Sequence, residues 1–372
     1  MSALETHAGG MPAPAGTFVY VSNAADGDIG TYGMQPDGAL QPGARVKAAD
    51  VVGPMTVSPD RRFLYAAVRS KPFSVHAYAI APGTGALAPL SVSPLAESFP
   101  YISLDKTGRY LFGASYQGHL ISVNAVGSDG RVAAAPLQVI PVGRNAHSIR
   151  IDESNRFVYV PTLGSDQIFQ FAFDAKSGRL SSNTPAVAQL QPMTGPRHFV
   201  TSADNRFLYA LSELLATVTT FALDGKTGLL SEIDSASGLP AGTRLVPGAP
   251  RVTGGEPNAA PPRNRDNDIW AADIHMTPNG RFLYITERTG STLGAFSVNA
   301  QTGKLTYLAS TPTESQPRGF AIAPNGRFLV AAGEKSDTIS VYAIDQASGA
   351  LSLLQKYPGG KGANWVEIVS FG

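Results

Sequence analysis

The sequence contains no cysteine among its 372 residues, which excludes disulfides, thiol nucleophiles and thiolate metal sites. It has no excess of charge either: the formal net charge is +1 and no run of Lys and Arg appears. Binding to nucleic acid or to an acidic membrane surface therefore has no electrostatic support. No apolar run approaches bilayer-spanning length, and the opening residues MSALETHAGGMPAPAG show no export signal. These absences predict a cytoplasmic protein that needs neither nucleic acid nor membrane.

Glycine and proline are abundant, with 39 and 28 residues, and they are spread along the chain rather than pooled in one linker. This distribution is typical of many short elements joined by tight turns, as in an all-β protein. With 43% hydrophobic residues, the chain can bury a large core.

A short motif of the type Arg-Phe-Leu-Tyr, preceded by turn residues, recurs along the chain. Its aromatic positions are Phe18, Phe63, Tyr110, Phe157, Phe207, Phe282 and Phe328, with spacings of 45, 47, 47, 50, 75 and 46 residues. After each motif comes a segment of alternating apolar residues, such as STLGAFSVNA, and then a turn and a short fourth segment, such as KTGLLSEI. Period-2 alternation marks half-buried strands, and four short strands per unit of about 45 residues indicate a β-propeller blade.

Seven units predict an all-β fold, a seven-bladed β-propeller with four antiparallel strands per blade. We expect residues 17–372 to form this single domain and residues 1–16 to be disordered. The first unit lacks its inner strand, and the tail NWVEIVSFG can supply one, since Trp365 falls where the next inner strand would begin. The ring would then be closed by the C-terminal strand joining the N-terminal blade, which leaves no unpaired edge.

Two positions in each unit should lie at one end of the central channel, because the inner strand and the second strand run antiparallel. Ten residues before the aromatic, at the start of the inner strand, stand Gly53, Pro100, His147, Arg197, Ala272 and Arg318. Six residues after it, at the end of the second strand, stand Ala24, Arg69, Tyr116, Leu163, Glu213, Arg288 and Glu334. These columns vary, whereas the blade-building columns scarcely change.

A residue that the blade itself needs should recur in every unit, but His147, Arg197, Glu213 and Arg288 do not. We interpret them as a shared site and expect Arg197 and Glu213 to meet there; solvated rim charges or salt bridges between blades are the alternative. Several arginines in one concave site suit an anionic ligand, because guanidinium forks match carboxylate or phosphate oxygens.

The 75-residue spacing reveals an insert at about residues 237–268, rich in Pro, Gly and Asn and without periodicity. It should overhang the same rim as a functional loop or a disordered excursion. It ends in WAADIH, which brings Trp270, Asp273 and His275 to the start of an inner strand. His76 and His119 lie in blade strands, and we interpret them as structural.

Motifs for metal or nucleotide chemistry are missing from the sequence. His and carboxylates are not paired at ligand spacing, and there is no nucleophile elbow, phosphate loop or dinucleotide fingerprint. We therefore expect no cofactor and no metal, and acid–base chemistry as the form of any catalysis.

The segments GPRHFV, ALSELLATVTTF, WAADIHMTPNGRFLYITERTGSTLGAFSV and TESQPRGFAIAPNGRFLVAAGEKSDTISVY closely resemble propeller-type bacterial 6-phosphogluconolactonases. The resemblance runs from about residue 17 to the end, and the wider family includes fungal carboxy-cis,cis-muconate cyclases. It implies that His147, Arg197, Glu213 and Arg288 are the catalytic residues. Tyr101 stands where relatives often have His, and the insert after residue 237 looks longer than theirs.

The resemblance implies a hydrolase that opens 6-phosphoglucono-1,5-lactone in the pentose phosphate pathway. Glu213 or His147 would take the proton of a water, Arg197 or Arg288 would face the oxyanion, and Arg69 or Arg318 would hold the phosphate. The residues expected to bind substrate are Arg69, Tyr116, His198, Asp273, His275 and Arg318. The alternatives are a lactonising cyclase and a non-enzymatic protein-binding propeller, and we expect a monomer or a weak homodimer.

Overall fold

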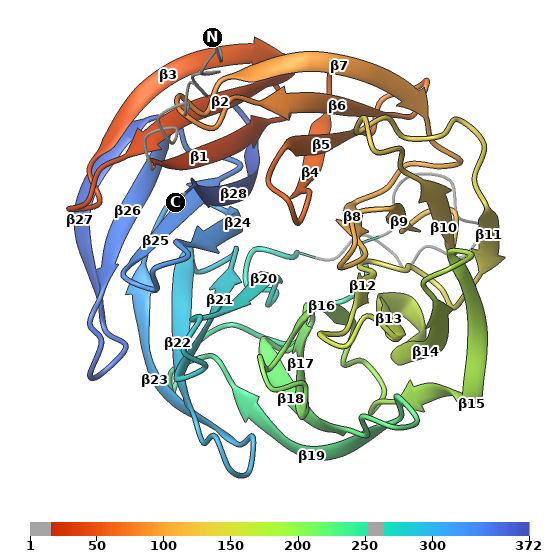
Figure 1. Cartoon of the computed structure of the whole chain (residues 1–372). Coiled ribbons are helices and arrows are strands. Elements are labelled where there is room, and N and C mark those ends of the chain that lie inside the picture. Colours follow the sequence, from red (N-terminus) through yellow and green to blue (C-terminus); the bar gives the residue numbers. More distant parts are fainter. Residues whose placement is uncertain (1–15, 252–263, 372) are drawn as a thin grey trace, which may run out of the picture.

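The computed structural model describes residues 16–251 and 264–371, which fold almost entirely as β-strands. The described residues form 28 strands in seven four-stranded antiparallel sheets, together with one 3-10 turn at Leu163–Ser165. The sheets surround a central axis as blades (Figure 1). The predicted seven-bladed β-propeller is therefore confirmed. Of the N-terminal segment predicted to be disordered, only Gly16 lies among the described residues, and it begins the first strand.

Each blade runs from an innermost strand to a peripheral one. From blade 1 to blade 7, the innermost strands are β28 (Ala363–Phe371), β4 (Val52–Val57), β8 (Tyr101–Leu104), β12 (Arg150–Ile151), β16 (Pro196–Thr201), β20 (Ala271–Met276) and β24 (Pro317–Ile322). The second strands are β1 (Gly16–Asn23), β5 (Phe63–Val68), β9 (Tyr110–Ser115), β13 (Phe157–Thr162), β17 (Phe207–Ser212), β21 (Phe282–Glu287) and β25 (Phe328–Gly333).

The third and fourth strands of each blade form its outer hairpin. The third strands are β2 (Asp28–Met34), β6 (Ser74–Ile80), β10 (Leu120–Ala125), β14 (Gln167–Asp174), β18 (Thr217–Leu223), β22 (Thr292–Val298) and β26 (Thr338–Ile344). The outermost strands are β3 (Leu40–Lys47), β7 (Leu87–Pro94), β11 (Gln138–Pro141), β15 (Arg179–Gln189), β19 (Leu230–Ser237), β23 (Leu305–Pro312) and β27 (Leu351–Pro358).

The turn between the innermost and second strands explains the residues that precede each recurring aromatic. The residue two positions before the aromatic has a positive φ in six blades, at Arg61, Gly108, Asn155, Asn205, Gly280 and Gly326. Gly adopts this left-handed conformation freely and Asn tolerates it, so five of these six residues are Gly or Asn.

The recurring aromatic ring of each blade packs against a glycine in the outer hairpin of the next blade. The seven pairs are Phe18–Gly85, Phe63–Gly130, Tyr110–Gly178, Phe157–Gly228, Phe207–Gly303, Phe282–Gly349 and Phe328–Gly38. A Cβ on any of these glycines would lie only 2.1–2.6 Å from a ring atom, and each glycine has a positive φ. The hydroxyls of Tyr20, Tyr159 and Tyr284 donate to the carbonyls of Gly85, Gly228 and Gly349 at 2.8–2.9 Å. The contact between the aromatic ring and the glycine therefore joins each blade to the next, and we call it the interlock between blades.

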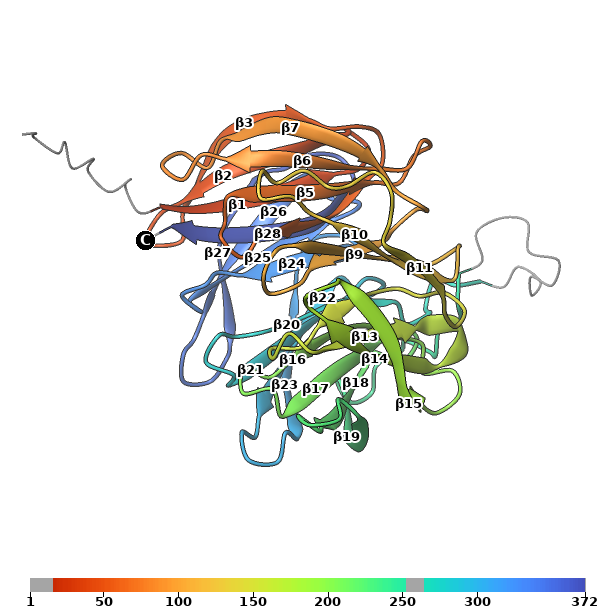
Figure 2. The same ribbon diagram turned by 45° about the vertical axis from the view of Figure 1, so that its right-hand side comes forward.

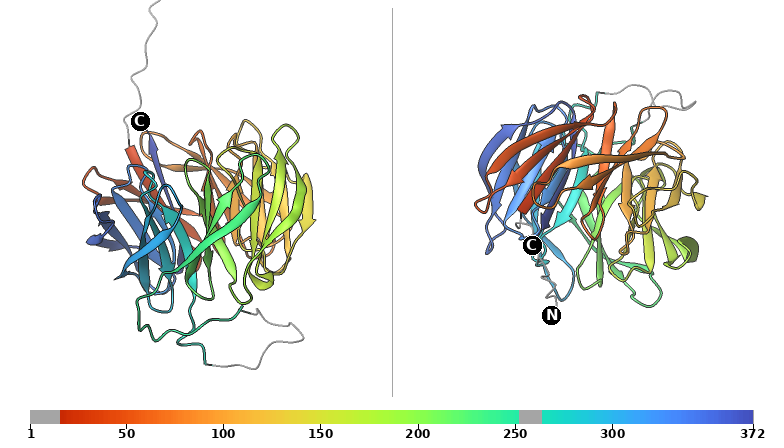
Figure 3. Two further views of the ribbon diagram at one scale, coloured as in Figure 1. Left: turned by 90° about the horizontal axis from the view of Figure 1, so that it is seen from below. Right: turned by 45° about the horizontal axis from the view of Figure 1, so that its top comes forward.

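The C-terminal strand closes the ring. β28 pairs antiparallel with β1, with Ile368 opposite Val19 and Trp365 opposite Ser22, and the two strands lie side by side in Figures 1 and 2. Blade 1 thus combines both ends of the chain, as predicted. The C-terminus and the described parts of the insert lie at opposite ends of the propeller (Figure 3).

Removal of residues 363–372 should destabilise the whole domain. The deletion removes β28 and exposes the edge of β1, and Val366 and Val369 lose side-chain burial worth about 1.5–3 kcal/mol each. We expect the free energy of unfolding in denaturant to fall by at least about 3 kcal/mol. An unchanged unfolding midpoint would contradict closure by β28.

Substitution of Gly228 by Ala tests the interlock between blades. The new Cβ would lie 2.2 Å from the Phe157 ring, at a residue whose φ is +71°. We expect a loss of about 2–4 kcal/mol from backbone strain and overpacking. Gly280→Ala is the matched control, because its φ is +69° as well and its Cβ would meet nothing within 4 Å. Equal losses in the two variants would show that the ring contact contributes nothing.

Candidate active site

Three of the predicted residues meet at one end of the channel. Arg197 lies at the start of β16, Glu213 directly follows β17, and Arg288 directly follows β21. Arg197 Nε donates to Glu213 Oε2 at 2.7 Å, and Arg288 Nη2 donates to the same oxygen at 3.1 Å. The three side chains are at most 5% exposed. The expected contact between Arg197 and Glu213 is present, and Arg288 of the next blade completes a cluster of two guanidiniums on one carboxylate.

Backbone carbonyls accept further hydrogen bonds from both guanidiniums. Arg288 donates through Nε to Trp270 O and through Nη2 to Ala271 O, both at 3.0 Å, and Arg197 Nη1 donates to Ala272 O. Within the described ranges, Arg197 Nη2, Arg288 Nη1 and Glu213 Oε1 have no hydrogen-bond partner, and none of these atoms is among the fully buried unsatisfied ones. Two donor groups and one carboxylate oxygen therefore remain for a ligand.

The cluster is electrostatically incomplete. It carries two positive charges and one negative charge away from bulk water. Burial lowers the pKa of Arg288 to about 9, although Glu213 acts in the opposite direction. Burial also lowers the pKa of Arg197, with Glu213 again opposing the shift. An uncompensated buried cation is costly, so an anionic ligand here would be stabilised.

A second layer of polar residues lies beneath Arg197. His198 Nδ1 lies 2.9 Å from Asp273 Oδ1, and His275 Nε2 lies 3.1 Å from Asp273 Oδ2. His198 Nε2 lies 3.0 Å from Arg197 Nη1. Because a guanidinium can only donate, Nε2 accepts and Nδ1 carries the proton toward Asp273. Burial, followed by the charge of Arg197, lowers the pKa of His198 to about 3, so the ring is neutral.

Two members of this layer are buried. His198 is 3% exposed and Asp273 is 6% exposed. We predicted both as substrate-binding residues; in the structure His198 contacts Arg197 and Asp273, and Asp273 contacts His198 and His275. His275 is more open and packs edge-on against Phe320, with ring centroids 4.7 Å apart.

His147 is placed beside the cluster. It precedes the two-residue strand β12 instead of starting it, yet its backbone N–H donates to Pro161 O at 3.0 Å. Its ring lies edge-on to Tyr116 and His198, at 5.6 and 5.1 Å between centroids, and its Nδ1 is buried without a partner among the described residues. Burial, followed by the charges of Arg197 and other cations, lowers the pKa of His147 well below its usual value. The imidazole is therefore neutral.

The remaining rim cations differ in their partners. Arg318 Nη1 donates to Glu334 Oε1 at 3.0 Å, which makes it one half of an ion pair. Arg69 crosses Gly53 and donates through Nε to Ser98 Oγ at 3.3 Å, with no carboxylate in ion-pair range among the residues described. Burial, followed by the charge of Arg318, lowers the pKa of Arg69 to about 10. Arg69 is thus more available to an anion than Arg318.

The insert returns to this rim. Gly248 N donates to Leu214 O, and Ile269 N donates to Val246 O, both at 2.8 Å. The guanidiniums of Arg251 and Arg288 lie 3.5 and 3.7 Å from the ring centre of Trp270. The sequence pointed to Trp270 but not to Arg251, since one arginine in an aperiodic segment carries no pattern. Residues 252–263 of the predicted insert lie outside the described part of the chain.

The floor of the site also includes residues that sequence reasoning missed. Trp365 of the closing strand packs edge-on against Tyr101, at 5.3 Å between centroids, and Tyr101 packs against His198 at 4.9 Å. The sequence indicates a role for Trp365 in ring closure only. Its position two residues into β28 could have revealed it, because the same position in blade 5 is His198.

His76 and His119 lie away from this cluster. His119 Nδ1 accepts a hydrogen bond from Asn145 N at 3.0 Å, and His76 lies on β6. Among the described residues, no group of three or more His, Asp or Glu side chains could hold a metal ion. No helix in the described part is long and apolar enough to cross a membrane.

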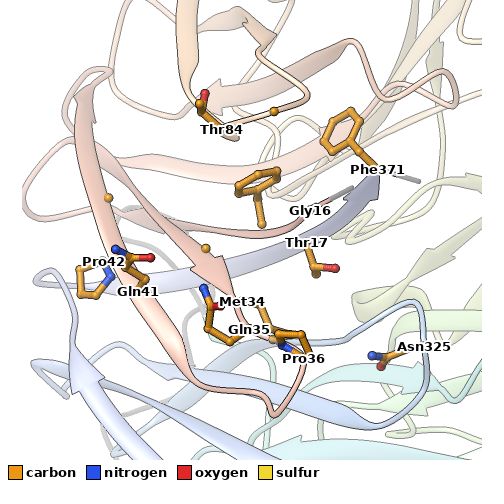
Figure 4. Close-up of a pocket in the computed structure, with 14 residues that line it drawn as sticks. Gly16, Thr17, Met34, Gln35, Pro36, Gln41, Pro42, Thr84, Asn325 and Phe371 are labelled. Atoms are coloured by element: carbon orange, nitrogen blue, oxygen red, sulfur yellow. The ribbon is translucent and has the colours of Figure 1, made fainter. Parts of the chain in front are cut away.

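A groove at the opposite end of blade 1 is separate from this cluster. It is formed by the first residues of β1 and the last of β28, with the lining side chains Thr17, Gln35, Gln41, Thr84 and Phe371 among others (Figure 4). None of the ten predicted site residues lines it.

Comparisons with known proteins agree with this architecture. Over residues 15–368 the chain matches the family described as "Lactonase, 7-bladed beta-propeller". It is 39% identical over 356 residues to the 6-phosphogluconolactonase of Serratia proteamaculans, which covers 95% of this chain and 99% of that one. The corresponding protein of Pectobacterium carotovorum is 37% identical over 353 residues, covering 95% and 98%.

Among solved structures, the periplasmic gluconolactonase of Pseudomonas aeruginosa superposes with a TM-score of 0.82 at 26% identity, covering 95% of this chain and 99% of that one. Sequence similarity and shape therefore extend over nearly the whole propeller. The chain belongs to the family of seven-bladed β-propeller lactonases.

Proposed function

We propose that the protein hydrolyses 6-phosphoglucono-1,5-lactone to the open-chain acid. The observation that carries this proposal is the buried cluster in which Arg197 and Arg288 share one oxygen of Glu213. Its surplus positive charge suits an anionic substrate whose carbonyl oxygen gains negative charge in the transition state. The names of the relatives from Serratia and Pectobacterium support the same substrate.

The two free guanidinium donors stabilise the oxyanion. Water attacks the carbonyl carbon of the lactone, and the carbonyl oxygen becomes negative in the tetrahedral intermediate. Arg197 Nη2 and Arg288 Nη1 have unused N–H groups, and their positions are already fixed by Glu213 and the backbone. Donors held in place before the reaction need no reorganisation as the charge develops.

Glu213 acts as the base and then as the acid. Its Oε2 is held by the guanidiniums, and its Oε1 takes a proton from the attacking water. When the ring C–O bond breaks, the same proton passes to the departing ring oxygen, which becomes a hydroxyl. The net reaction consumes one water and leaves a carboxylic acid, so it needs no cofactor.

His147 is a weaker candidate for the base. Its ring is neutral, but four neighbouring cationic or ionisable groups disfavour its protonated form. We assign it instead to hydrogen bonding with the substrate or the water. Arg69, which has no carboxylate partner in the described part of the chain, adds to the positive field that attracts the anion. The cytoplasmic location and the monomeric or weakly dimeric state stay predictions.

Replacement of Glu213 by Gln should lower kcat/KM for freshly prepared 6-phosphoglucono-1,5-lactone by about 10²- to 10⁴-fold, the range of a general base. Rates are measured against the spontaneous hydrolysis of the lactone. Glu232→Gln on the exposed face of β19 is the control and should keep full activity. A rate near wild type in the Glu213→Gln/His147→Ala double variant would reject the mechanism. Faster turnover of a carboxy-muconate would favour the cyclase alternative.

The neutral state of His147 predicts a pH signature in stability. Its folded pKa lies well below the unfolded value near 6.5, so its contribution is present above pH 6.5 and is lost as the pH falls, when the unfolded chain binds a proton. Between pH 7 and pH 5, wild type should lose more of its free energy of unfolding than His147→Gln, because the unfolded chain gains a proton that the folded His147 does not bind. Denaturant unfolding at the two pH values measures the difference. Parallel losses would show that His147 is protonated in the folded protein.

A further inference from the structure

Arg251 is the one described arginine of the insert that stacks on the active-site rim. Its guanidinium lies 3.5 Å from the ring centre of Trp270, and its backbone carbonyl accepts a hydrogen bond from Tyr116 Oη at 3.3 Å. Trp270 directly precedes β20 of blade 6, and Tyr116 directly follows β9 of blade 3. Arg251 is therefore placed by two blades on different sides of the channel mouth.

Trp270 connects Arg251 to the catalytic cluster. The guanidinium of Arg288 lies 3.7 Å from the ring centre of the same indole, and two cations so close to one ring cannot share a face without colliding. The two guanidiniums must therefore stack on opposite faces of the indole, with the ring between them. The backbone of Trp270 is held as well, because its carbonyl accepts from Arg288 Nε and its N–H donates to Glu287 Oε1.

The stacked guanidinium is prepared for an anion. Stacking uses the face of the group, so the N–H donors at its edge stay available, and the side chain has already lost much of its rotamer freedom. Across the described ranges, no carboxylate lies in ion-pair range of Arg251, and no hydrogen bond from its guanidinium is formed. The group is half-buried, and the positive charges of Arg265 and Arg288 lie nearby.

We propose that Arg251 recognises the phosphate of the substrate and thereby selects phosphorylated over unphosphorylated sugar lactones. This inference rests on the proposed function. With the lactone carbonyl between Arg197 and Arg288, the phosphate on the exocyclic C6 oxygen lies one ring's width away. Arg251 is separated from Arg288 only by the indole of Trp270, and it lies on the outer side of the cluster. A planar guanidinium edge can bind two phosphate oxygens at once.

Arg251 suits this role better than the other rim cations. Arg318 is engaged by Glu334, and Arg69 has one donor on Ser98 and lies in the field of both Arg318 and Glu334. Arg251 also comes from the irregular insert rather than from a blade. A binding preference can therefore change there without disturbing the repeated packing of the propeller.

The test compares kcat/KM on 6-phosphoglucono-1,5-lactone and on glucono-1,5-lactone for wild type, Arg251→Met and Arg251→Lys. Loss of a charge-assisted hydrogen bond should lower kcat/KM on the phosphorylated lactone by about 10- to 100-fold in Arg251→Met, with little change on the unphosphorylated one. Arg251→Lys should recover part of the loss. Arg244→Met removes the same charge from an exposed position of the insert and is the matched control.

Several outcomes would overturn the inference. Equal losses on both lactones would mean that Arg251 only positions Trp270 and Arg288. A loss confined to the phosphorylated lactone in Arg69→Met but not in Arg251→Met would move the phosphate site to Arg69. Calorimetric binding of 6-phosphogluconate and gluconate separates this inference from the proposed function. Tighter binding of the phosphorylated acid that depends on Arg251 would support the phosphate site even in an inactive protein, and equal binding of the two acids would refute it.

Discussion

The contact on which the rest of the structure depends is the aromatic ring of one blade against the outer-hairpin glycine of the next. It occurs seven times and joins Phe328 of the last blade to Gly38 of the first, so it closes the ring at the periphery. β28 closes the ring at the centre by pairing with β1. The ring is thus closed both at its periphery and near its axis. This rigidity holds the strand ends in fixed positions, so that side chains from different blades can form one site.

The site depends on departures from the repeat. Arg197 and Glu213 belong to blade 5 and Arg288 to blade 6, and one carboxylate oxygen joins them. Burying two cations with one anion is unfavourable in the free protein, and the surrounding carbonyls and His198 make it tolerable. The same imbalance favours a substrate that brings negative charge. In the function we propose, substrate binding and oxyanion stabilisation therefore derive from this one electrostatic feature.

The C-terminal strand and the insert, which do not follow the repeat, add side chains around the charged cluster. The C-terminal strand adds Trp365 beneath His198, and the insert adds Arg251 above Trp270. Neither segment contributes to the Arg197–Glu213–Arg288 cluster itself. In the function we propose, the blades thus hold the reacting groups, while the insert and the closing strand shape the surroundings of these groups.

The sequence by itself determined the number of blades, the strand order and the closing strand, because the repeated aromatic, turn and glycine positions follow from local geometry and nearest-neighbour packing. It also placed His147, Arg197, Glu213 and Arg288 at one rim, since antiparallel pairing brings the two ends of neighbouring strands together. The sequence did not show that Arg318 forms an ion pair with Glu334 while Arg69 has no carboxylate partner among the described residues. It also did not show that His198 and Asp273 form a layer beneath Arg197. It gave no sign of Arg251 on Trp270. Those features were decided by tertiary structure, because ion-pair choice, burial and stacking depend on distances between segments that no local pattern encodes.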